Sequence, residues 1–115
     1  MAFGTRWLAA IGIALALPGT AAAQSCPSKP IRMVVPYTPG GYTDLMARTV
    51  GQKLSEALGQ PFIFENRPGA NAIIGTDVVA KAAPDGYTFG TVIAAHAVNA
   101  TLNPKLPYDT LKDFS

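Results

Sequence analysis

The stretch VVPYTPGGYTDLMAR, residues 34–48, decides the fold. An apolar run over residues 33–35 is typical of a strand covered on both faces, and it stops at Pro36. Two glycines follow, and Thr43 and Asp44 then open a segment with helical spacing. Thr43 or its neighbour suits the helix cap, and Asp44 suits the positively charged first turn. A strand that passes through a glycine turn into a helix is the beginning of an α/β unit.

The same alternation continues along the chain. Gly59 is placed to end the first helix, and a Pro-Gly turn and a Pro-Asp-Gly turn separate the later segments. Strands are predicted at 31–36, 61–66 and 87–94, helices at 43–58 and 72–83, and some helical character at 95–102. This order predicts an α/β layer, a βαβαβ unit with parallel strands and right-handed crossovers.

Each predicted helix carries apolar residues at helical spacing, and we expect these to face the sheet. In the first helix they are Met46, Val50, Leu54, Ala57 and Leu58, and in the second they are Ile74 and Val78 with small residues near Ala82.

The N-terminal residues 1–23 have the order of a secretory signal peptide. Arg6 is followed by an apolar stretch, Trp7–Leu17, and by small residues that end at Ala23, where we expect cleavage. The alternative, an uncleaved anchor, is disfavoured because the apolar stretch is shorter than the ~20 residues that a membrane-spanning helix needs. We therefore expect export to the periplasm, with residues 24–115 as the mature domain.

Composition limits the function of this mature domain. Without Arg6, eight basic residues stand against seven acidic ones, and no basic run remains, so a nucleic-acid partner is not expected. The single cysteine, Cys26, forms no internal disulfide. Acylation of Cys26 is an alternative that the preceding Ala23-Gln24-Ser25 disfavours, and an unpaired thiol near the mature N-terminus is the simpler interpretation.

The segment from Pro39 to Asp44 has two chemical interpretations. It follows the carboxyl end of a strand, where ligands bind in open α/β sheets, and it precedes a helix whose free N–H groups favour anions. Gly40 and Gly41 let the backbone approach a ligand closely, and Thr43 offers a hydroxyl. A plain turn with a helix cap explains the same residues. Asp44 suits a capping or water-binding role better than direct contact with an anion.

Other candidates follow the later strands. His96 is the only histidine, and no spaced cysteine or acid joins it, so no metal site, cofactor or catalytic triad is indicated. A loop histidine bonded to the backbone is the simpler interpretation than ligand contact. For Asn99, helix capping and ligand contact stay open. Arg67 is expected to be a solvated loop residue.

The residues KPIRMVVPYTPGGYTDLMAR, LGQPFIFENRPGANAIIGTDVVAKAAPDGYTF and NPKLPYDTLKDF resemble the Bug-type, or TctC-type, solute-binding receptors of tripartite tricarboxylate transporters. The resemblance covers residues 28–114. It implies no enzyme activity but a two-lobed periplasmic binding-protein fold, similar to type II, that holds a small organic acid and passes it to membrane permease subunits. Such a receptor is expected to be a monomer.

The family block P-x-x-P-G-G-x-x-D matches Pro36, Pro39, Gly40, Gly41 and Asp44. The resemblance implies that this loop helps to hold a ligand carboxylate, partly through water, which favours the anion-binding interpretation. It also implies that the segment with His96 and Asn99 lines the cleft. Tyr42 departs from the small residue of many relatives, and it either alters the pocket or points outward.

Family members are much longer than 115 residues, so we expect the first lobe only, with the second lobe absent. A truncated remnant without binding function, or with interactions only, is the alternative. A nucleotide-dependent enzyme, with Glu65 placed to bind a ribose, is disfavoured because PGGYTD is not the G-x-G-x-x-G fingerprint.

Overall fold

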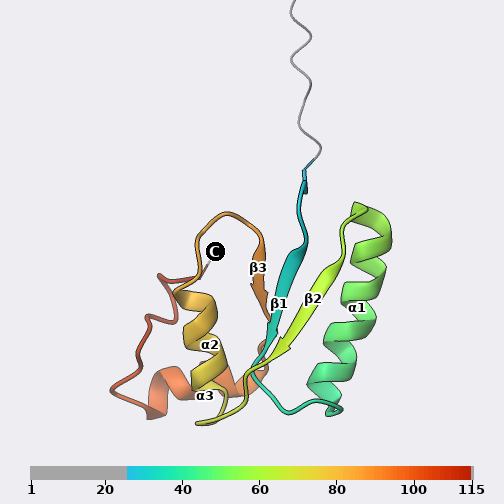
Figure 1. The fold of residues 1–115 in the computed structure, drawn as a ribbon. Helices are drawn as coiled ribbons and strands as arrows, with labels where there is room; N and C mark the ends of the chain where they lie inside the picture. Colours follow the sequence, from blue (N-terminus) through green and yellow to red (C-terminus); the bar gives the residue numbers. More distant parts are fainter. Residues whose placement is uncertain (1–25, 115) are drawn as a thin grey trace, which may run out of the picture.

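The computed structural model describes residues 26–114, in which three strands alternate with three helices (Figure 1). The elements are β1 (Ile31–Val35), α1 (Tyr42–Leu58), β2 (Phe62–Asn66), α2 (Ile73–Ala80), β3 (Thr88–Gly90) and α3 (Ala94–Leu102). The strand order is β2-β1-β3 and both pairings are parallel, which confirms the predicted βαβαβ unit. The predicted signal peptide and its cleavage near Ala23 lie outside the described residues.

The sheet has helices on both faces, with α1 on one side and α2 on the other (Figure 1). Met33 and Val35 of β1 pack against Ala47 of α1, together with Phe62 and Phe64 of β2. Because the strands are parallel, the loops that leave their carboxyl ends all lie along the same edge of the sheet, the one formed by these strand ends (Figure 1). These loops are residues 36–41, 67–72 and 91–93. The third strand is shorter than the predicted 87–94. Its pairing register with β1 runs only from Thr88 to Gly90, and residues 91–93 form a loop that leads into α3.

The predicted core face of α1 is wrong. The buried positions are Asp44, Ala47 and Gly51, whereas the predicted apolar residues of this helix are exposed. Small residues face the sheet because the Phe64 ring fills the space beneath them. A Cβ built at Gly51 would lie 2.5 Å from Cζ of Phe64. The helix therefore packs closely through its small side chains, and its large apolar side chains lie to one side.

The second helix approaches the sheet equally closely. A Cβ at Gly75 would lie 2.7 Å from both Cβ of Pro36 and the carbonyl oxygen of Arg67. Ile74, which was expected to face the core, is exposed, because Gly75 and Thr76 are the residues of this helix that pack inward. Gly59 ends α1 in the left-handed conformation with φ +69°, as its position predicted.

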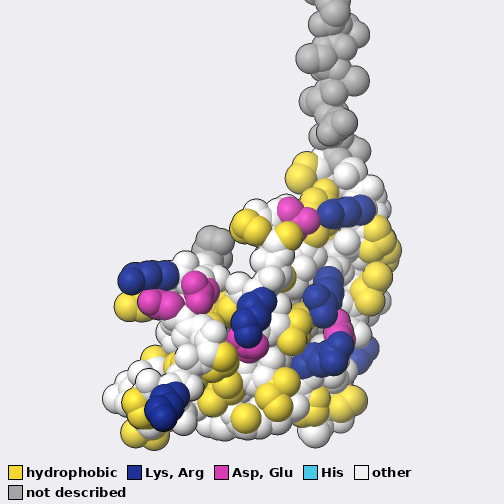
Figure 2. Space-filling view, turned by 60° about the vertical axis from the view of Figure 1, so that its left-hand side comes forward, with side chains coloured by type: hydrophobic (Ala, Val, Ile, Leu, Met, Phe, Trp, Pro, Cys, Tyr) yellow, Lys and Arg dark blue, Asp and Glu magenta, His cyan; other side chains and the backbone are white. Residues whose placement is uncertain are grey.

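On the surface, acidic and basic side chains alternate. Lys29 pairs with Asp85 at 3.1 Å, and Figure 2 shows basic side chains beside acidic ones over the visible face. Cys26 is exposed and unpaired. Within residues 26–114, no helix combines the length and the apolar character required to cross a membrane.

Candidate functional site

The loop between β1 and α1 is organised around the carboxylate of Asp44. This side chain is only 3% exposed. Its Oδ2 atom accepts hydrogen bonds from the backbone N–H of Gly40 at 2.9 Å and from Nε of Arg48 at 3.0 Å, and its Oδ1 accepts one from Nδ2 of Asn66 at 2.9 Å. The bond from Arg48, followed by those from Gly40 and Asn66, holds the pKa of Asp44 well below its usual range.

These bonds tie the loop to the end of the neighbouring strand. Asn66, the last residue of β2, also donates from Nδ2 to the carbonyl oxygen of Tyr37 at 3.0 Å. Asp44 and Asn66 together therefore fix the chain on both sides of the glycine pair. Both carboxylate oxygens of Asp44 accept hydrogen bonds from within the protein. The geometry therefore supports a role for Asp44 in positioning the loop between β1 and α1.

The start of α1 leaves backbone donors at the loop surface. The first intrahelical bond runs from N–H of Leu45 to the carbonyl oxygen of Gly41, and no side chain caps the helix. The preceding N–H groups therefore have no intrahelical partner. Pro39, Gly40 and Gly41 are exposed, and Thr43 is half-buried. This exposed helix start can accept an anion.

The loop between β2 and α2 contains three consecutive non-glycine residues with positive φ. The angles are 47° at Ala70, 52° at Asn71 and 73° at Ala72. L-residues rarely adopt this conformation, and such strain gathers at functional sites. Sequence reasoning missed this loop as part of a site. The one available signal was Asn71, since asparagine tolerates left-handed conformations better than most residues.

Asn99 of α3 holds this strained loop in place. Its side chain is 2% exposed, and its Nδ2 donates to the carbonyl oxygen of Asn71 at 2.9 Å. Its Oδ1 accepts from Nδ2 of Asn71 at 3.0 Å and from Nδ2 of Asn103 at 3.1 Å. Asn99 lies within α3 and does not cap its start. The geometry supports a role for Asn99 in holding the loop at residues 70–72 in place.

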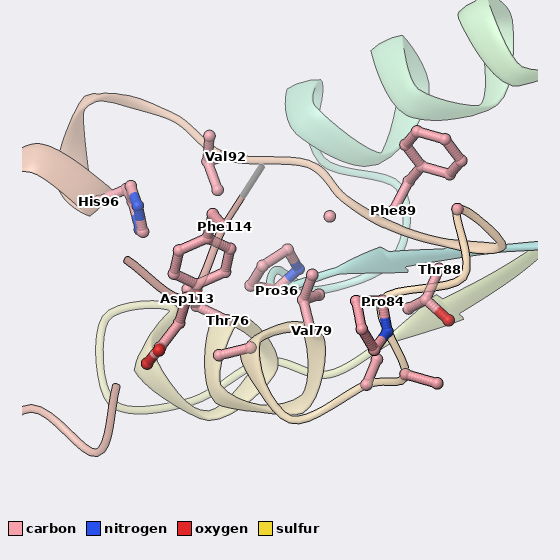
Figure 3. A pocket seen from close by; sticks show the side chains of 15 residues that line it. Pro36, Thr76, Val79, Pro84, Thr88, Phe89, Val92, His96, Asp113 and Phe114 are labelled. Atoms are coloured by element: carbon pink, nitrogen blue, oxygen red, sulfur yellow. The ribbon is translucent and has the colours of Figure 1, made fainter. Parts of the chain in front are cut away.

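His96 belongs to an aromatic cluster. Its ring stacks on Tyr108 at 6.0 Å between centroids, and Phe114 meets it edge-on at 5.3 Å. Nδ1 of His96 is buried without a hydrogen-bond partner among the described residues. The imidazole lines a cavity of about 490 Å³ beside α2 and β3, to which Pro36, Thr76 and Phe114 also contribute (Figure 3).

The sequence-predicted residues thus form two groups. The first group lies in the turn between β1 and α1 and in the first turn of that helix, and it consists of Pro39, Gly40, Gly41, Thr43 and Asp44. His96 and Asn99 lie on α3, and the cavity beside His96 is not lined by residues 37–43. Within residues 26–114, no hydrogen bond joins the two groups.

Glu65, the residue weighed as a ribose-binding acid, is bound within the protein. It forms ion pairs with Arg32 and Arg67. Hydrogen bonds from Arg32 and then from Arg67 lower the pKa of this carboxyl group. Arg67 is therefore exposed but paired, in place of the purely solvated arginine that was expected. Both carboxylate oxygens of Glu65 already have partners, which removes the support for a nucleotide site.

Comparison with known proteins identifies the family. The model of the tripartite tricarboxylate transporter family receptor, TctC, matches residues 46–115. The chain belongs to this family, whose members are binding receptors and not enzymes. It is 48% identical over 114 residues to protein BugT of Bordetella pertussis, covering 95% of this chain and 35% of BugT.

Solved structures show the same architecture. A periplasmic transporter superposes with a TM-score of 0.72 at 48% identity, and MatC of Rhodopseudomonas palustris, solved with bound malate, with 0.71 at 39% identity. Each match covers 76% of this chain and 30% of the other. A second R. palustris protein, solved with adipate, gives 0.70 at 40% identity and covers 74% and 29%. The chain thus spans about a third of the length of its relatives.

Proposed function

We propose that residues 26–114 form part of the first lobe of a periplasmic receptor that captures a small organic acid, such as a dicarboxylate or tricarboxylate. The receptor serves a tripartite tricarboxylate transporter, works as a monomer, and passes its ligand to the permease subunits. Residues 1–23 direct export and are removed near Ala23. Membership in a receptor family supports this proposal for the class of function.

The observation that carries the proposal is the exposed start of α1 behind Gly40 and Gly41. Backbone N–H groups and the helix dipole favour a negative charge there, and the glycines leave the approach open. Asp44 and Asn66 fix the loop before any ligand arrives. A carboxylate bound at this point would meet donors that are already in place, so little ordering would be needed.

The candidate residues differ in how directly they contact the ligand in this proposal. Gly41 and Thr43 supply donors to the carboxylate, and Pro39 and Gly40 line its approach. Asp44 positions this turn by accepting the N–H of Gly40. The strained loop at 70–72, supported by Asn99, forms a second wall at the same edge of the sheet. His96 lies farther along that edge and makes a secondary contribution through the aromatic cluster that it forms.

The ligand class is supported by two relatives. MatC was solved with malate and a second R. palustris protein with adipate, and both molecules carry two carboxylates. The two ligands differ in length and in hydroxylation while sharing the charged ends. An anion-binding helix start is suited to the shared part, the carboxylate.

The experiment uses a chimera in which residues 26–114 replace the matched third of BugT, hereafter the chimeric receptor. Titration calorimetry with malate, adipate and citrate should give saturable binding of at least one acid. Adipamide, which has the length of adipate without its charges, is the matched control and should not bind. Equal binding of adipate and adipamide, or no binding of any acid by the chimeric receptor, would refute the proposal.

A further inference from the structure

A negatively charged side chain lies directly behind the exposed turn that precedes α1. The carboxylate of Asp44 is 3% exposed, and its Oδ2 accepts the N–H of Gly40 at 2.9 Å. The pKa of Asp44 lies well below its usual range, with the hydrogen bond from Arg48 as the largest cause, so this carboxylate is ionised at neutral pH. A negative charge is thus fixed one hydrogen bond behind the surface at which the proposed function places an anion.

An unbalanced charge on Asp44 would oppose the binding of a carboxylate there. Two like charges a few ångströms apart near a protein surface repel each other strongly enough to weaken binding about tenfold or more. The free N–H groups at a helix start supply a positive charge of only roughly half an elementary charge. A carboxylate at the start of α1 would therefore gain much less from these donors if Asp44 had no positive partner.

Arg48 supplies the positive charge that balances Asp44. Its Nε donates to Oδ2 of Asp44 at 3.0 Å, and its Nη2 donates to Oδ1 of Asn66 at 3.1 Å. The guanidinium also lies 5.0 Å from the ring centroid of Phe64. These three contacts fix the guanidinium beside the carboxylate. Among residues 26–114, Arg48 is the one basic residue that forms an ion pair with Asp44.

We propose that Arg48 is a charge-compensating residue of the receptor, which cancels the charge of Asp44 so that the turn at Gly40 and Gly41 can accept a carboxylate. This inference rests on the proposed function and adds a residue to it. The guanidinium is turned toward Asn66 and Phe64 of β2, so Arg48 acts through Asp44 and not by binding the ligand. The pair keeps the acceptor that holds Gly40 in place while removing the repulsion that this acceptor would otherwise exert.

Titration calorimetry on the chimeric receptor tests the role of Arg48, with whichever of malate, adipate and citrate binds most tightly. Arg48→Met keeps a long side chain against Phe64 but removes the charge, and it should raise the dissociation constant about tenfold. Arg48→Lys retains the charge and should stay within about twofold of the unsubstituted receptor. Arg32→Met is the matched control and should leave affinity unchanged, because Arg32 is a similarly exposed arginine that pairs with a different carboxylate, that of Glu65.

A double substitution separates charge compensation from a purely structural role. Adding Asp44→Asn to Arg48→Met removes both charges and keeps an oxygen that can accept the N–H of Gly40. The double variant should therefore recover most of the lost affinity, to within about threefold of the unsubstituted receptor. If Arg48 served packing or loop stability alone, the second substitution would weaken binding further.

Ionic strength provides an independent measurement. The loss of affinity in Arg48→Met should shrink when NaCl is raised from about 50 mM to about 500 mM, because salt screens repulsion between charges and does not repair a packing defect. A loss of the same size at both concentrations contradicts charge compensation.

The remaining outcomes distinguish this inference from the proposed function. If the unsubstituted receptor binds an acid, the inference is overturned by an unchanged dissociation constant in Arg48→Met, or by a double variant that binds more weakly than Arg48→Met. If the unsubstituted receptor binds none of the acids, the proposed function fails and the inference fails with it. Thermal melts show whether Arg48→Met folds. If it does not, the double variant decides, because it buries no unpaired charge, and a tenfold loss of affinity in it would overturn the inference.

Discussion

Replacing Gly41 with valine in the chimeric receptor should weaken carboxylate binding without unfolding the protein. Gly41 has φ −77° and ψ 170°, an extended conformation that suits a β-branched residue. A Cβ at this position would lie 3.6 Å from the carbonyl oxygen of Thr38, an ordinary contact. The added methyl groups would instead occupy the space above the first N–H groups of α1.

The expected magnitudes differ for stability and for binding. Glycine is preferred over valine immediately before a helix, so the substitution should lower the free energy of unfolding by about 1 kcal/mol or less. A hydrogen bond to a charged group contributes about 1.5–3 kcal/mol. Loss of one such bond to the ligand corresponds to a dissociation constant about ten to a hundredfold higher.

Calorimetry and a thermal melt on the same preparation test this prediction. Gly59→Ala is the crossed control, since Gly59 has φ +69° with open space around it and lies at the other end of α1. An alanine there should reduce stability by roughly 1–2 kcal/mol through backbone strain, without placing bulk over the helix start. A dissociation constant unchanged in a normally melting Gly41→Val protein would refute the proposed carboxylate contact.

Three further predictions concern stability and the outer part of the site. Gly75→Ala should lower the free energy of unfolding by about 1–3 kcal/mol, because its Cβ would overlap backbone atoms, and an unchanged urea midpoint would contradict this close packing. The lowered pKa of Asp44 means that its carboxylate stabilises the fold above pH ~4 and that this stability is lost on acidification. Asp44→Asn should therefore be less stable at neutral pH, with the difference shrinking toward pH ~2, and melting curves that stay equally separated at all pH values would disprove this. His96→Ala should weaken binding less than the valine substitution, and calorimetry that gives the opposite order would move the site to α3.

The element order could be predicted from the sequence because local signals agree along the chain. Apolar runs and glycine turns alternate, and Gly59 marks the end of α1 in both the pattern and the structure. The predicted N-cap at Thr43 or its neighbour is wrong, because α1 begins at Tyr42 directly after Gly41 and no side chain caps it. The face of α1 that packs inward could not be predicted in the same way. It depends on the bulk of Phe64, a residue of the next strand, which admits only a glycine at position 51. Periodicity identifies an apolar face but not what lies opposite it.

The candidate site, like the fold, could be predicted only in part from the sequence. Pro39, Gly40 and Gly41 are visible in the sequence because glycine and proline carry strong local information. The strained loop at 70–72 was not visible, because two of its three residues are alanines, which have no particular preference for positive φ. Its conformation depends on Asn99, a residue 28 positions from Asn71 in the chain. Long-range hydrogen bonds of this kind have no sequence periodicity to reveal them.

The contacts of Asp44 and Asn99 suggest a common principle for this edge of the sheet. Each buried polar side chain is bonded to a loop that leaves a strand end. Buried polar groups of this kind are costly unless they are fully bonded, so they specify a single loop conformation. In the receptor proposed above, rigid loops would lower the entropic cost of binding, because few groups need to be ordered when a ligand arrives. Both loops are therefore held in one conformation by hydrogen bonds from within the protein.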